Sequence, residues 1–460
     1  MSQTNFSSLP LSQPMLSCIE SLGYHQMTPI QAQSLPHILE GKDIIGQGKT
    51  GSGKTVAFGI GLLTRIKPEK FNVQALVLCP TRELAEQVGK EIRRLARFTQ
   101  NIKLLTLCGG TPIAPQVTSL EKGVHIIVAT PGRLMDHLSK QTLNLKAVNT
   151  LVLDEADRML DMGFNEAITS IIAEIPKTRQ TLLFSATFPD SIKKMSASIQ
   201  RKPISVKAET NHEPTKIEQL FFEIKKHERN NTLLLLLTHY KPASVVIFCK
   251  TKRDTQDVAD MLNEKGHSAV AIHGDLEQRD RNQVLIRFSN QSCPILVATD
   301  VAARGLDIED LEMVINYELP RDSEVYVHRI GRTGRAGKGG LAMSLFMQSE
   351  VVKLNAIEDL QGRPCRCDVP ESLDHDNAFK LKAGMTTLQI DAGRKSKIRP
   401  GDILGAITGD AGFAANIVGK IDVLDNQTYV AVNKDMANQL VKRLADGKIK
   451  GRKLRVRKLD

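Results

Sequence analysis

The sequence predicts an α/β protein with two tandem parallel-sheet domains followed by a small βαββαβ domain. Two observations support the pair of sheets: short apolar runs alternate with helical stretches over residues 1–206, and the same rhythm returns over residues 217–363. A third observation sets the end of the chain apart, because residues 385–460 are strongly basic and show a different order of elements. A chain of 460 residues has room for three domains of roughly 150 residues each.

The first domain is expected to contain buried parallel strands separated by helices. The clearest strand-type runs cover residues 75–79, 126–129, 151–153 and 181–184. A helix over residues 82–97 separates the first two of these runs, as in a βαβ unit. A polar connector over residues 207–216 then leads out of this domain.

The second domain repeats this architecture without repeating the sequence. Its predicted strands cover residues 244–249, 269–272, 295–298 and 313–316. A linker is expected over residues 364–384, where Pro, Cys, Asp and Lys are mixed. Cys365 and Cys367 lie in this linker, and no second cysteine pair nearby would complete a metal site.

The third domain, residues 385–460, alternates strands and helices in the order βαββαβ. Its predicted strands cover residues 388–390, 418–423, 428–432 and 454–456, and its helices cover residues 400–407 and 436–444. This order fits a ferredoxin-like or RNA-recognition module.

Charge and composition restrict the class of protein further. The net charge is +11, and residues 380–460, with 17 basic and 8 acidic side chains, contribute +9 of it. This asymmetry favours a polyanionic partner for the end of the chain, with a merely solvated basic face as the alternative. No apolar run reaches membrane-spanning length, and the first residues lack the pattern of a secretory signal. The seven scattered cysteines suit reduced thiols, so we expect a cytoplasmic protein.

Two motifs point to nucleotide chemistry. Residues 48–55, GKTGSGKT, fit the P-loop pattern, in which backbone N–H groups and a lysine hold phosphates and a hydroxyl reaches Mg²⁺. About a hundred residues later an apolar strand ends at Asp154 and Glu155, where one acid can hold Mg²⁺ and the next can polarise water. Alone, these patterns also fit a glycine-rich turn and an acidic helix start. Together they favour a site for ATP and Mg²⁺.

Taken in order, the motifs resemble those of the DEAD-box ATP-dependent RNA helicases. In the first domain the similar segments are GYHQMTPIQ at 23–31, GKTGSGKT at 48–55, PTRELAEQ at 80–87, GG at 109–110, TPGR at 130–133, DEAD at 154–157 and SAT at 185–187. In the second they are VIFCKTK at 246–252, QRDR at 278–281, ATDVAARGLD at 298–307 and YVHRIGRTGRAG at 326–337. Gly48 stands where the family usually has Ala. The resemblance runs from about Phe6 to about Gln361 and implies two RecA-like domains.

The resemblance also implies a role for particular residues. Those implied in catalysis are Lys54, Asp154, Glu155 and the arginine fingers Arg332 and Arg335. Those implied in ATP binding are Phe6, Thr28, Gln31, Gly48, Lys49, Thr50, Gly51, Ser52, Gly53, Lys54, Thr55 and Asp307, with Thr55 and Asp154 at Mg²⁺. Those implied in coupling ATP to RNA are Asp157, Ser185, Thr187 and His328. Phe6 also fits an ordinary apolar contact, and Ser185 or Thr187 a helix cap.

RNA contacts are implied on both domains and expected on the third. On the first two domains they are Arg82, Gly109, Gly110, Thr130, Gly132, Arg133, Gln278, Arg281, Thr299 and Arg304. The third domain resembles that of the bacterial DbpA-type subfamily, which implies 23S ribosomal RNA and large-subunit assembly particles as partners. There we expect contacts from Arg394, Lys395, Lys397, Arg399, Tyr429, Lys448, Lys450, Arg452, Lys453, Arg455 and Arg457. Aromatic residues are sparse, with Gln389 at one favoured stacking position, so ordinary two-base stacking is in doubt.

Two other functions remain open at this point. A DNA-directed helicase could use the same two domains, and RNA preference would require contacts to 2′-hydroxyl groups. An ATP-gated RNA clamp or assembly scaffold, in which unwinding is secondary, is the other. Lys54, Glu155, Arg332 and Arg335 argue against it, because a scaffold does not need hydrolytic residues.

Overall fold

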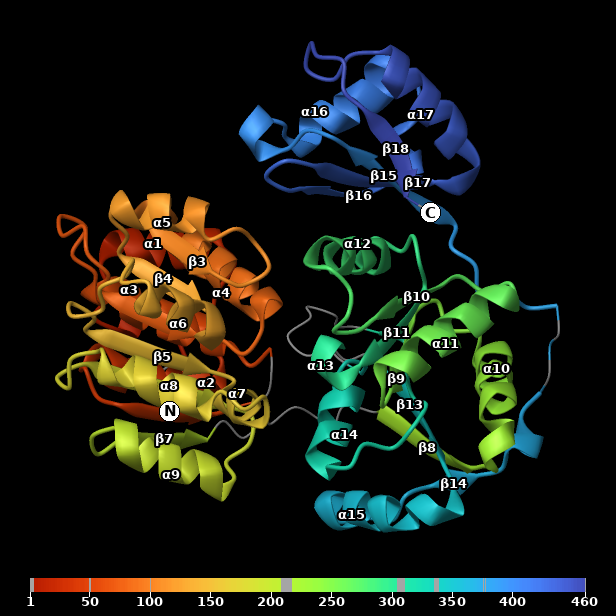
Figure 1. Ribbon diagram of the computed structural model, residues 1–460, viewed down its shortest axis with the longest axis horizontal. Helices are drawn as coiled ribbons and strands as arrows, with labels where there is room; N and C mark the ends of the chain where they lie inside the picture. The colour runs from red at the N-terminus through yellow and green to blue at the C-terminus, as the bar shows by residue number, and fades with distance from the viewer. Residues whose placement is uncertain are drawn as a thin grey trace. The chain divides into compact units, whose positions relative to one another are not determined.

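A computed structural model describes residues 4–48, 51–99, 101–207, 217–303, 311–334, 339–374, 376 and 378–459. Two compact units are described, one over residues 4–207 and the other over residues 217–459 (Figure 1). The first unit is one domain. The second contains a sheet domain and the small C-terminal module.

The first unit is built on a seven-stranded parallel sheet with the order β3-β4-β2-β5-β6-β1-β7. Its strands are β1 Ile44–Gln47, β2 Ala75–Leu78, β3 Leu104–Leu107, β4 Ile126–Ala129, β5 Thr150–Asp154, β6 Gln180–Ser185 and β7 Ile204–Lys207. The helices are α1 Gln13–Ser21, α2 Pro29–Leu39, α3 Lys54–Arg65, α4 Arg82–Leu95, α5 Ala114–Glu121, α6 Pro131–Ser139, α7 Ala156–Asp161, α8 Asn165–Ala173 and α9 Asp190–Ile199.

Alternate residues of the central strands enter two separate cores in this domain. In β2, Ala75 and Val77 belong to one apolar cluster, and Leu76 and Leu78 belong to the other. Helices cover both faces of the sheet (Figure 1). This double burial explains why the strands are continuous apolar runs instead of alternating ones.

The second unit contains a parallel sheet with the order β10-β11-β9-β12-β13-β8-β14. Its strands are β8 Ile217–Glu223, β9 Val245–Cys249, β10 Ala269–Ile272, β11 Ile295–Thr299, β12 Met313–Asn316, β13 Gly340–Phe346 and β14 Cys367–Asp368. The helices are α10 Arg229–Tyr240, α11 Lys252–Glu264, α12 Gln278–Ser289, α13 Asp300–Ala303, α14 Ser323–Ile330 and α15 Val351–Gln361.

The segment expected as a linker packs onto this second sheet domain. Its residues Cys367–Asp368 form β14, which pairs with β8 at the sheet edge. Leu373 and Leu381 are buried in the core of the domain. The expectation of a separate linker is therefore corrected: apolar side chains spaced along the segment anchor it to the domain.

The C-terminal module has the predicted βαββαβ order. Its antiparallel sheet has the order β16-β17-β15-β18, with β15 Met385–Ile390, β16 Val418–Val423, β17 Thr428–Asn433 and β18 Val456–Leu459. The helices are α16 Pro400–Gly405 and α17 Ala437–Asp446. The closing strand begins two residues later than predicted, because residues 457–459 complete the ladder with Gln389, Leu388 and Thr387.

The sheet face of the module rests on the preceding domain. Thr387 accepts a hydrogen bond from the Asn290 side chain at 2.9 Å and donates one to Ser292 Oγ at 2.9 Å. Gln283 on α12 donates to Gln389 at 3.4 Å. The polar residues at the usual base-stacking face are thus used in contacts within the second unit.

Candidate active site and RNA-binding surfaces

The P-loop follows β1 and ends where α3 begins. Gly51 and Gly53 have φ angles of +81° and +92°, a left-handed conformation that turns the chain sharply before Lys54. Lys54 is 6% exposed, and its ammonium donates to the Gly48 carbonyl at 2.7 Å. That partner is neutral, so the hydrogen bond does not neutralise the lysine, whose charge acts on the buried Asp154. Lys49 and Thr50 lie outside the described residues.

Thr28 and Gln31 support this loop directly. Thr28 Oγ1 donates to the Ser52 carbonyl at 2.8 Å, and Gln31 Nε2 donates to the Gly53 carbonyl at 3.1 Å. Gln31 Oε1 accepts from the Thr28 backbone N–H at 2.9 Å. The structure thus places both predicted residues against the P-loop and uses the amide of Gln31 there. Phe6 is 3% exposed and packs in the core of the domain.

The two acids of the DEAD segment lie at the carboxyl end of β5, where parallel sheets place their ligands. Asp154 is 3% exposed and ends the strand. Glu155 has φ +55°, a left-handed conformation that is rare outside glycine, and its carboxylate accepts from Arg158 Nη1 at 2.6 Å. Arg158 was not predicted from the sequence, although an arginine three residues after an acid on a helix start suggests such a pair.

The acid end of β5 has the chemistry of a Mg²⁺ site. Asp154 Oδ1 is buried and has no hydrogen-bond partner within the described chain. Burial raises the pKa of Asp154, with Lys54 opposing that effect. An unsatisfied buried carboxylate oxygen and the hydroxyl of Thr55 near the start of α3 fit a hard cation that takes its remaining ligands from phosphate and water.

The DEAD and SAT segments are joined by hydrogen bonds. Asp157 Oδ2 accepts from the backbone and the hydroxyl of Thr187, both at 2.9 Å, and the Asp157 N–H donates to Ser185 Oγ at 3.3 Å. Burial raises the pKa of Asp157, but the hydrogen bonds from Thr187 and Ser185 outweigh it and lower the pKa. The Gly48 N–H donates to the Ser185 carbonyl, so the same segment also contacts the P-loop.

In the second unit the arginine motif lies at the end of α14. Arg332 is 7% exposed, and His328 lies one turn earlier on the helix. Arg329, which the sequence analysis missed, pairs with Asp300 at 2.6 and 2.8 Å and donates to Asn316 at 3.0 Å. The position of Arg329 inside the HRIGRTGR segment could have marked it as a residue of the site. Arg304, Asp307 and Arg335 lie outside the described residues.

The glycine pair and the TPGR segment follow neighbouring strands of the first sheet. Gly109 and Gly110 come after β3, Thr130 comes after β4, and the two strands pair up to Leu107 and Ala129. Arg82 lies against the glycine pair, because a Cβ added to Gly110 would stand 1.8 Å from its Nη1. A Cβ added to Gly132 would meet nothing within 4 Å. The structure therefore gathers Arg82, both glycines and the start of α6 at one sheet edge.

Comparison with known proteins decides the family. Residues 28–195 match the family described as DEAD/DEAH box helicase, residues 225–337 match the helicase conserved C-terminal domain, and residues 387–458 match the DbpA RNA binding domain. The chain is 53% identical over 457 residues to the ATP-dependent RNA helicase DbpA of Escherichia coli, covering 99% of this chain and 100% of that protein. The chain belongs to the DEAD-box ATP-dependent RNA helicases.

Other relatives share the helicase domains of this enzyme. The CshA helicase of Bacillus cereus is 46% identical over 370 residues, which are 80% of this helicase and 70% of CshA. The S. cerevisiae Dbp5 structure bound to RNA and ADP BeF3 is 31% identical with a TM-score of 0.72, covering 80% of this chain and 96% of that one. The predictions of a DbpA-type helicase, of its fold class and of its enzyme class are confirmed.

On the second sheet domain of this helicase, the predicted RNA residues lie at the same kind of edge. Gln278 is the first residue of α12, Arg281 lies one turn later, and Thr299 ends β11. Helix α12 also carries Gln283 and Ser289, which contact the C-terminal module. The predicted RNA edge and the module therefore share one helix.

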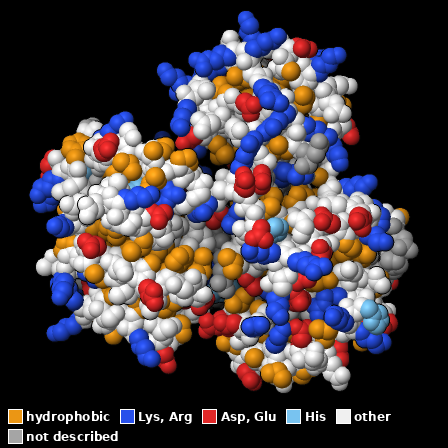
Figure 2. All heavy atoms as spheres, in the orientation of Figure 1, with side chains coloured by type: hydrophobic (Ala, Val, Ile, Leu, Met, Phe, Trp, Pro, Cys, Tyr) orange, Lys and Arg blue, Asp and Glu red, His pale blue; other side chains and the backbone are white. Residues whose placement is uncertain are grey.

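The two basic segments of the module meet at Lys450. Lys450 Nζ donates to the Lys397 carbonyl at 2.5 Å and pairs with Asp402 at 3.0 Å. Lys and Arg side chains gather over the module in Figure 2. The exposed basic residues of this surface are Arg394, Lys395, Lys397, Arg399, Lys448, Lys450, Arg452, Lys453 and Arg455.

Two of the residues predicted to bind RNA on the module lie on the sheet face that packs against the preceding domain. Tyr429 is 2% exposed and its hydroxyl donates to Gln427, so its ring is not available for the RNA contact predicted from the sequence. Arg457 donates to Gln389 Oε1 at 2.9 Å on the same sheet face. The cause is the docking of this face on the preceding domain, which the sequence of the module alone does not reveal.

Neither a membrane span nor a clustered metal site is found in the described part of the chain. No helix there combines the length and the apolar character needed to cross a membrane. No three or more His, Cys, Asp or Glu side chains there are grouped to hold a metal ion.

Proposed function

We propose that this helicase is an RNA-dependent ATPase that locally unwinds short RNA duplexes and is directed to 23S ribosomal RNA in large-subunit assembly particles. It would act in the cytoplasm, with ATP and Mg²⁺. The observation that carries the targeting part is the basic surface of the module, which is attached through α12 next to Gln278 and Arg281. RNA held by the module would thereby be presented beside the helicase edge.

ATP hydrolysis is assigned to residues at the carboxyl ends of β1 and β5. Lys54 and the P-loop backbone would bind phosphate, while Thr55 and Asp154 would hold Mg²⁺, which neutralises phosphate charge. Glu155 would orient the attacking water, because Arg158 fixes its carboxylate at 2.6 Å. Arg332 and Arg335 would supply positive charge to the γ-phosphate, with Asp307 near the nucleotide.

The coupling between ATP and RNA is assigned to the contact of the DEAD and SAT segments. Asp157, Ser185 and Thr187 are joined by hydrogen bonds, and the Ser185 carbonyl also accepts from the P-loop. A change at the phosphates would therefore reach residues 185–187 through one hydrogen-bonded connection. His328 is the proposed counterpart in the second domain.

RNA binding by the helicase domains is assigned to backbone and side-chain groups at their sheet edges. Backbone N–H groups near glycines, together with arginines and hydroxyls, suit phosphate contacts that do not depend on sequence. The proposed set is Arg82, Gly109, Gly110, Thr130, Gly132, Gln278, Arg281, Thr299 and Arg304. Recognition of one RNA must then come from the module.

Removing the module tests the targeting role. A chain ending at Gly384 keeps Leu373 and Leu381 in the core of the second domain and loses the polar contacts of the module with Gln283, Ser289, Asn290 and Ser292. We expect it to remain an RNA-stimulated ATPase and to lose the preference for ribosomal RNA over an unrelated structured RNA of equal length. Strand separation and single-turnover hydrolysis would distinguish this function from an ATP-gated clamp.

A matched pair of full-length variants serves as a control for the truncation. Lys395→Gln with Lys453→Gln changes two exposed charges of the basic surface, whereas Lys434→Gln with Lys442→Gln changes two exposed charges elsewhere on the module. Only the first pair should reduce the preference. If full-length and truncated proteins rank the two RNAs alike near physiological salt, the module is a nonspecific electrostatic tether and the targeting proposal is wrong.

A further inference from the structure

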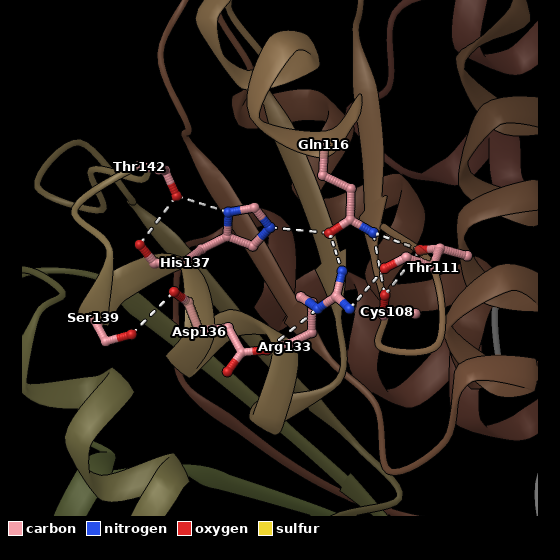
Figure 3. A network of polar contacts seen from close by, with 8 residues as sticks. All are labelled: Cys108, Thr111, Gln116, Arg133, Asp136, His137, Ser139 and Thr142. Atoms are coloured by element: carbon pink, nitrogen blue, oxygen red, sulfur yellow. Dashed lines mark hydrogen bonds and ion pairs between the residues drawn. The ribbon is translucent and has the colours of Figure 1, made fainter. Parts of the chain in front are cut away.

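A buried polar network connects the two RNA-proximal segments of the first domain. Gln116 on α5 lies between the turn after β3 and helix α6, with Arg133 and His137 on its other side (Figure 3). We propose that Gln116 and His137 are positioning residues for RNA binding, which hold the Gly109–Gly110 turn at a fixed place relative to the start of α6. This inference rests on the proposed RNA path along that edge.

The side-chain amide of Gln116 uses its full hydrogen-bonding capacity. Nε2 donates to the Cys108 carbonyl and to Thr111 Oγ1, both at 3.1 Å. Oε1 accepts from Arg133 Nη1 at 2.9 Å and from His137 Nε2 at 3.0 Å. Reversing the amide would set its oxygen against the Cys108 carbonyl and its NH₂ against a guanidinium. The network therefore permits one orientation.

The same logic determines the tautomer of His137. Because Gln116 Oε1 is an acceptor, His137 Nε2 must carry a proton, and Nδ1 of the neutral ring can accept from the Thr142 hydroxyl at 2.8 Å. The ring is fully buried. Burial lowers the pKa of His137, and Arg133 and Lys140 lower it further against the opposing effect of Asp136. The imidazole is thus a neutral donor anchored at both nitrogens.

Arg133 belongs to this buried polar network as well. Nη2 donates to the Thr111 carbonyl at 2.9 Å, and the side chain is 10% exposed. Its guanidinium therefore points at the turn instead of outward. The prediction for Arg133 therefore changes from a phosphate contact to a positioning role. At the start of α6, Thr130 and Gly132 remain the residues proposed to contact RNA phosphate.

The buried polar network lies just beyond the end of the backbone hydrogen-bond ladder between β3 and β4. The last hydrogen bond that joins β3 and β4 at this edge runs from the Thr130 N–H to the Leu107 carbonyl at 3.1 Å. Beyond it, the turn at Gly109–Gly110 and the first turn of α6 are held together through Gln116, Arg133 and Thr111. Phosphate groups along a strand have a fixed spacing, so two sets of N–H donors must keep a matching distance. Loosening that distance should weaken RNA binding without changing the chemistry at the P-loop.

The test compares two buried glutamines in the full-length protein. Gln116→Met removes the four hydrogen bonds at the RNA edge. Gln74→Met removes a comparable buried set, to the Lys67 N–H and the Lys67 and Lys70 carbonyls at 2.8 to 2.9 Å, at the opposite end of β2. RNA-stimulated ATPase is measured against RNA concentration, together with ATP affinity and thermal stability without RNA.

We expect the half-saturating RNA concentration to rise roughly 5- to 30-fold in Gln116→Met, the factor that corresponds to losing hydrogen bonds of this kind. Turnover at saturating RNA and ATP affinity should stay unchanged. Gln74→Met should lower thermal stability similarly without moving the RNA concentration. Equal RNA curves for wild type and Gln116→Met would overturn the inference.

A second variant keeps the test decisive if Gln116→Met does not fold. Gln116→Glu preserves the volume and the two acceptor bonds to Arg133 and His137, but it cannot donate to Cys108 or Thr111. It should therefore also need more RNA, and a wild-type RNA curve for this variant counts against the inference. If the wild-type ATPase ignores RNA altogether, the proposed function fails instead.

Discussion

The two sheet domains share one topology and differ in chemistry. Matching strands in chain order, β1 with β8 through β7 with β14, gives the same lateral order in both sheets. After β1 the first domain has a glycine-rich loop and Lys54, whose ammonium donates to a neutral carbonyl. After β8 the second domain has a short helical turn and Arg229, which pairs with Glu350 at 3.3 Å and donates to the Tyr317 carbonyl. The arginine of the second arrangement is held in an ion pair, whereas Lys54 donates to a carbonyl and acts on Asp154 through its charge.

The ends of β5 and β12 show the same contrast. The first domain continues from its strand into Asp154 and Glu155, and the second continues into Asn316 and Tyr317. The proposed RNA edges, in contrast, occupy equivalent places: Thr130 follows β4 and Thr299 ends β11. In the neighbouring strands the match continues: Thr81 caps α4 after β2, and Thr251 caps α11 after β9. The proposed RNA edges thus occur in both domains, whereas the P-loop and the acidic pair belong to the first domain, because these motifs depend on loops carried by the sheet.

The comparison predicts its largest effect at Glu155. Glu155→Gln should lower ATP turnover at saturating RNA by about 10²–10⁴-fold while leaving ATP affinity largely intact, because a positioned base is lost and the charge on phosphate is unaffected. The measurement is steady-state ATPase beside equilibrium nucleotide binding. The matched change in the second domain, Tyr317→Phe, removes a hydroxyl that donates to Asn230 at 2.7 Å and should leave turnover near wild type. Comparable hydrolysis by Glu155→Gln would remove the proposed role.

A second prediction distinguishes the effect of the P-loop's shape on ATP binding from the effect of backbone strain on stability, by comparing Gly53→Ala with Gly23→Ala. An alanine Cβ at Gly53 would lie 2.4 Å from Gln31 Nε2, whereas at Gly23, with φ +81°, it would meet nothing within 4 Å. Both substitutions should lower stability by about 1–3 kcal/mol, because both force alanine into the left-handed region. Only Gly53→Ala should also weaken ATP binding, measured by titration with a fluorescent nucleotide. Equal ATP affinity in the two variants would show that Gln31 and Thr28 do not shape the loop.

The last prediction concerns the contact between the DEAD and SAT segments, where only stability is expected to change. Thr187→Val removes one hydrogen bond to the Asp157 carboxylate and should lower the free energy of unfolding by about 1–3 kcal/mol at neutral pH. The pKa of Asp157 is lowered in the folded protein, so this stabilisation is present above the unfolded value of about 3.9 and is lost as pH falls below it. Urea unfolding at several pH values should therefore show the two proteins converging in acid.

Thr169→Val provides the control for that experiment. The Thr169 hydroxyl donates to the Asn165 carbonyl on an exposed helix, with no carboxylate involved. Its effect on stability should not change with pH. A pH-independent difference for Thr187→Val would mean that the Asp157 contact does not contribute as a charged hydrogen bond.

The sequence by itself determined the class of fold and the nucleotide motifs. Apolar runs predicted β4, β10 and β12 to the residue, and a hairpin pattern predicted β16, since buried strands and hairpins have a local signature. It missed β3, β7, β8, β13 and β14. Polar residues such as Thr106, Gln219 and Ser344 interrupt the apolar runs of β3, β8 and β13. These strands form because parallel neighbours supply their hydrogen bonds, and that support is not local.

Tertiary structure alone decided which polar side chains meet. Gln116 and His137 lie 21 residues apart and Asp157 and Thr187 lie 30 apart, so no local pattern pairs them. The same applies to Tyr429, a predicted RNA contact that is buried because Thr387, Asn290 and Ser292 close its face of the sheet. Local propensity and spacing specify elements and short motifs. The partners of a buried polar group are specified by whichever distant segments the packed sheet brings within hydrogen-bond distance.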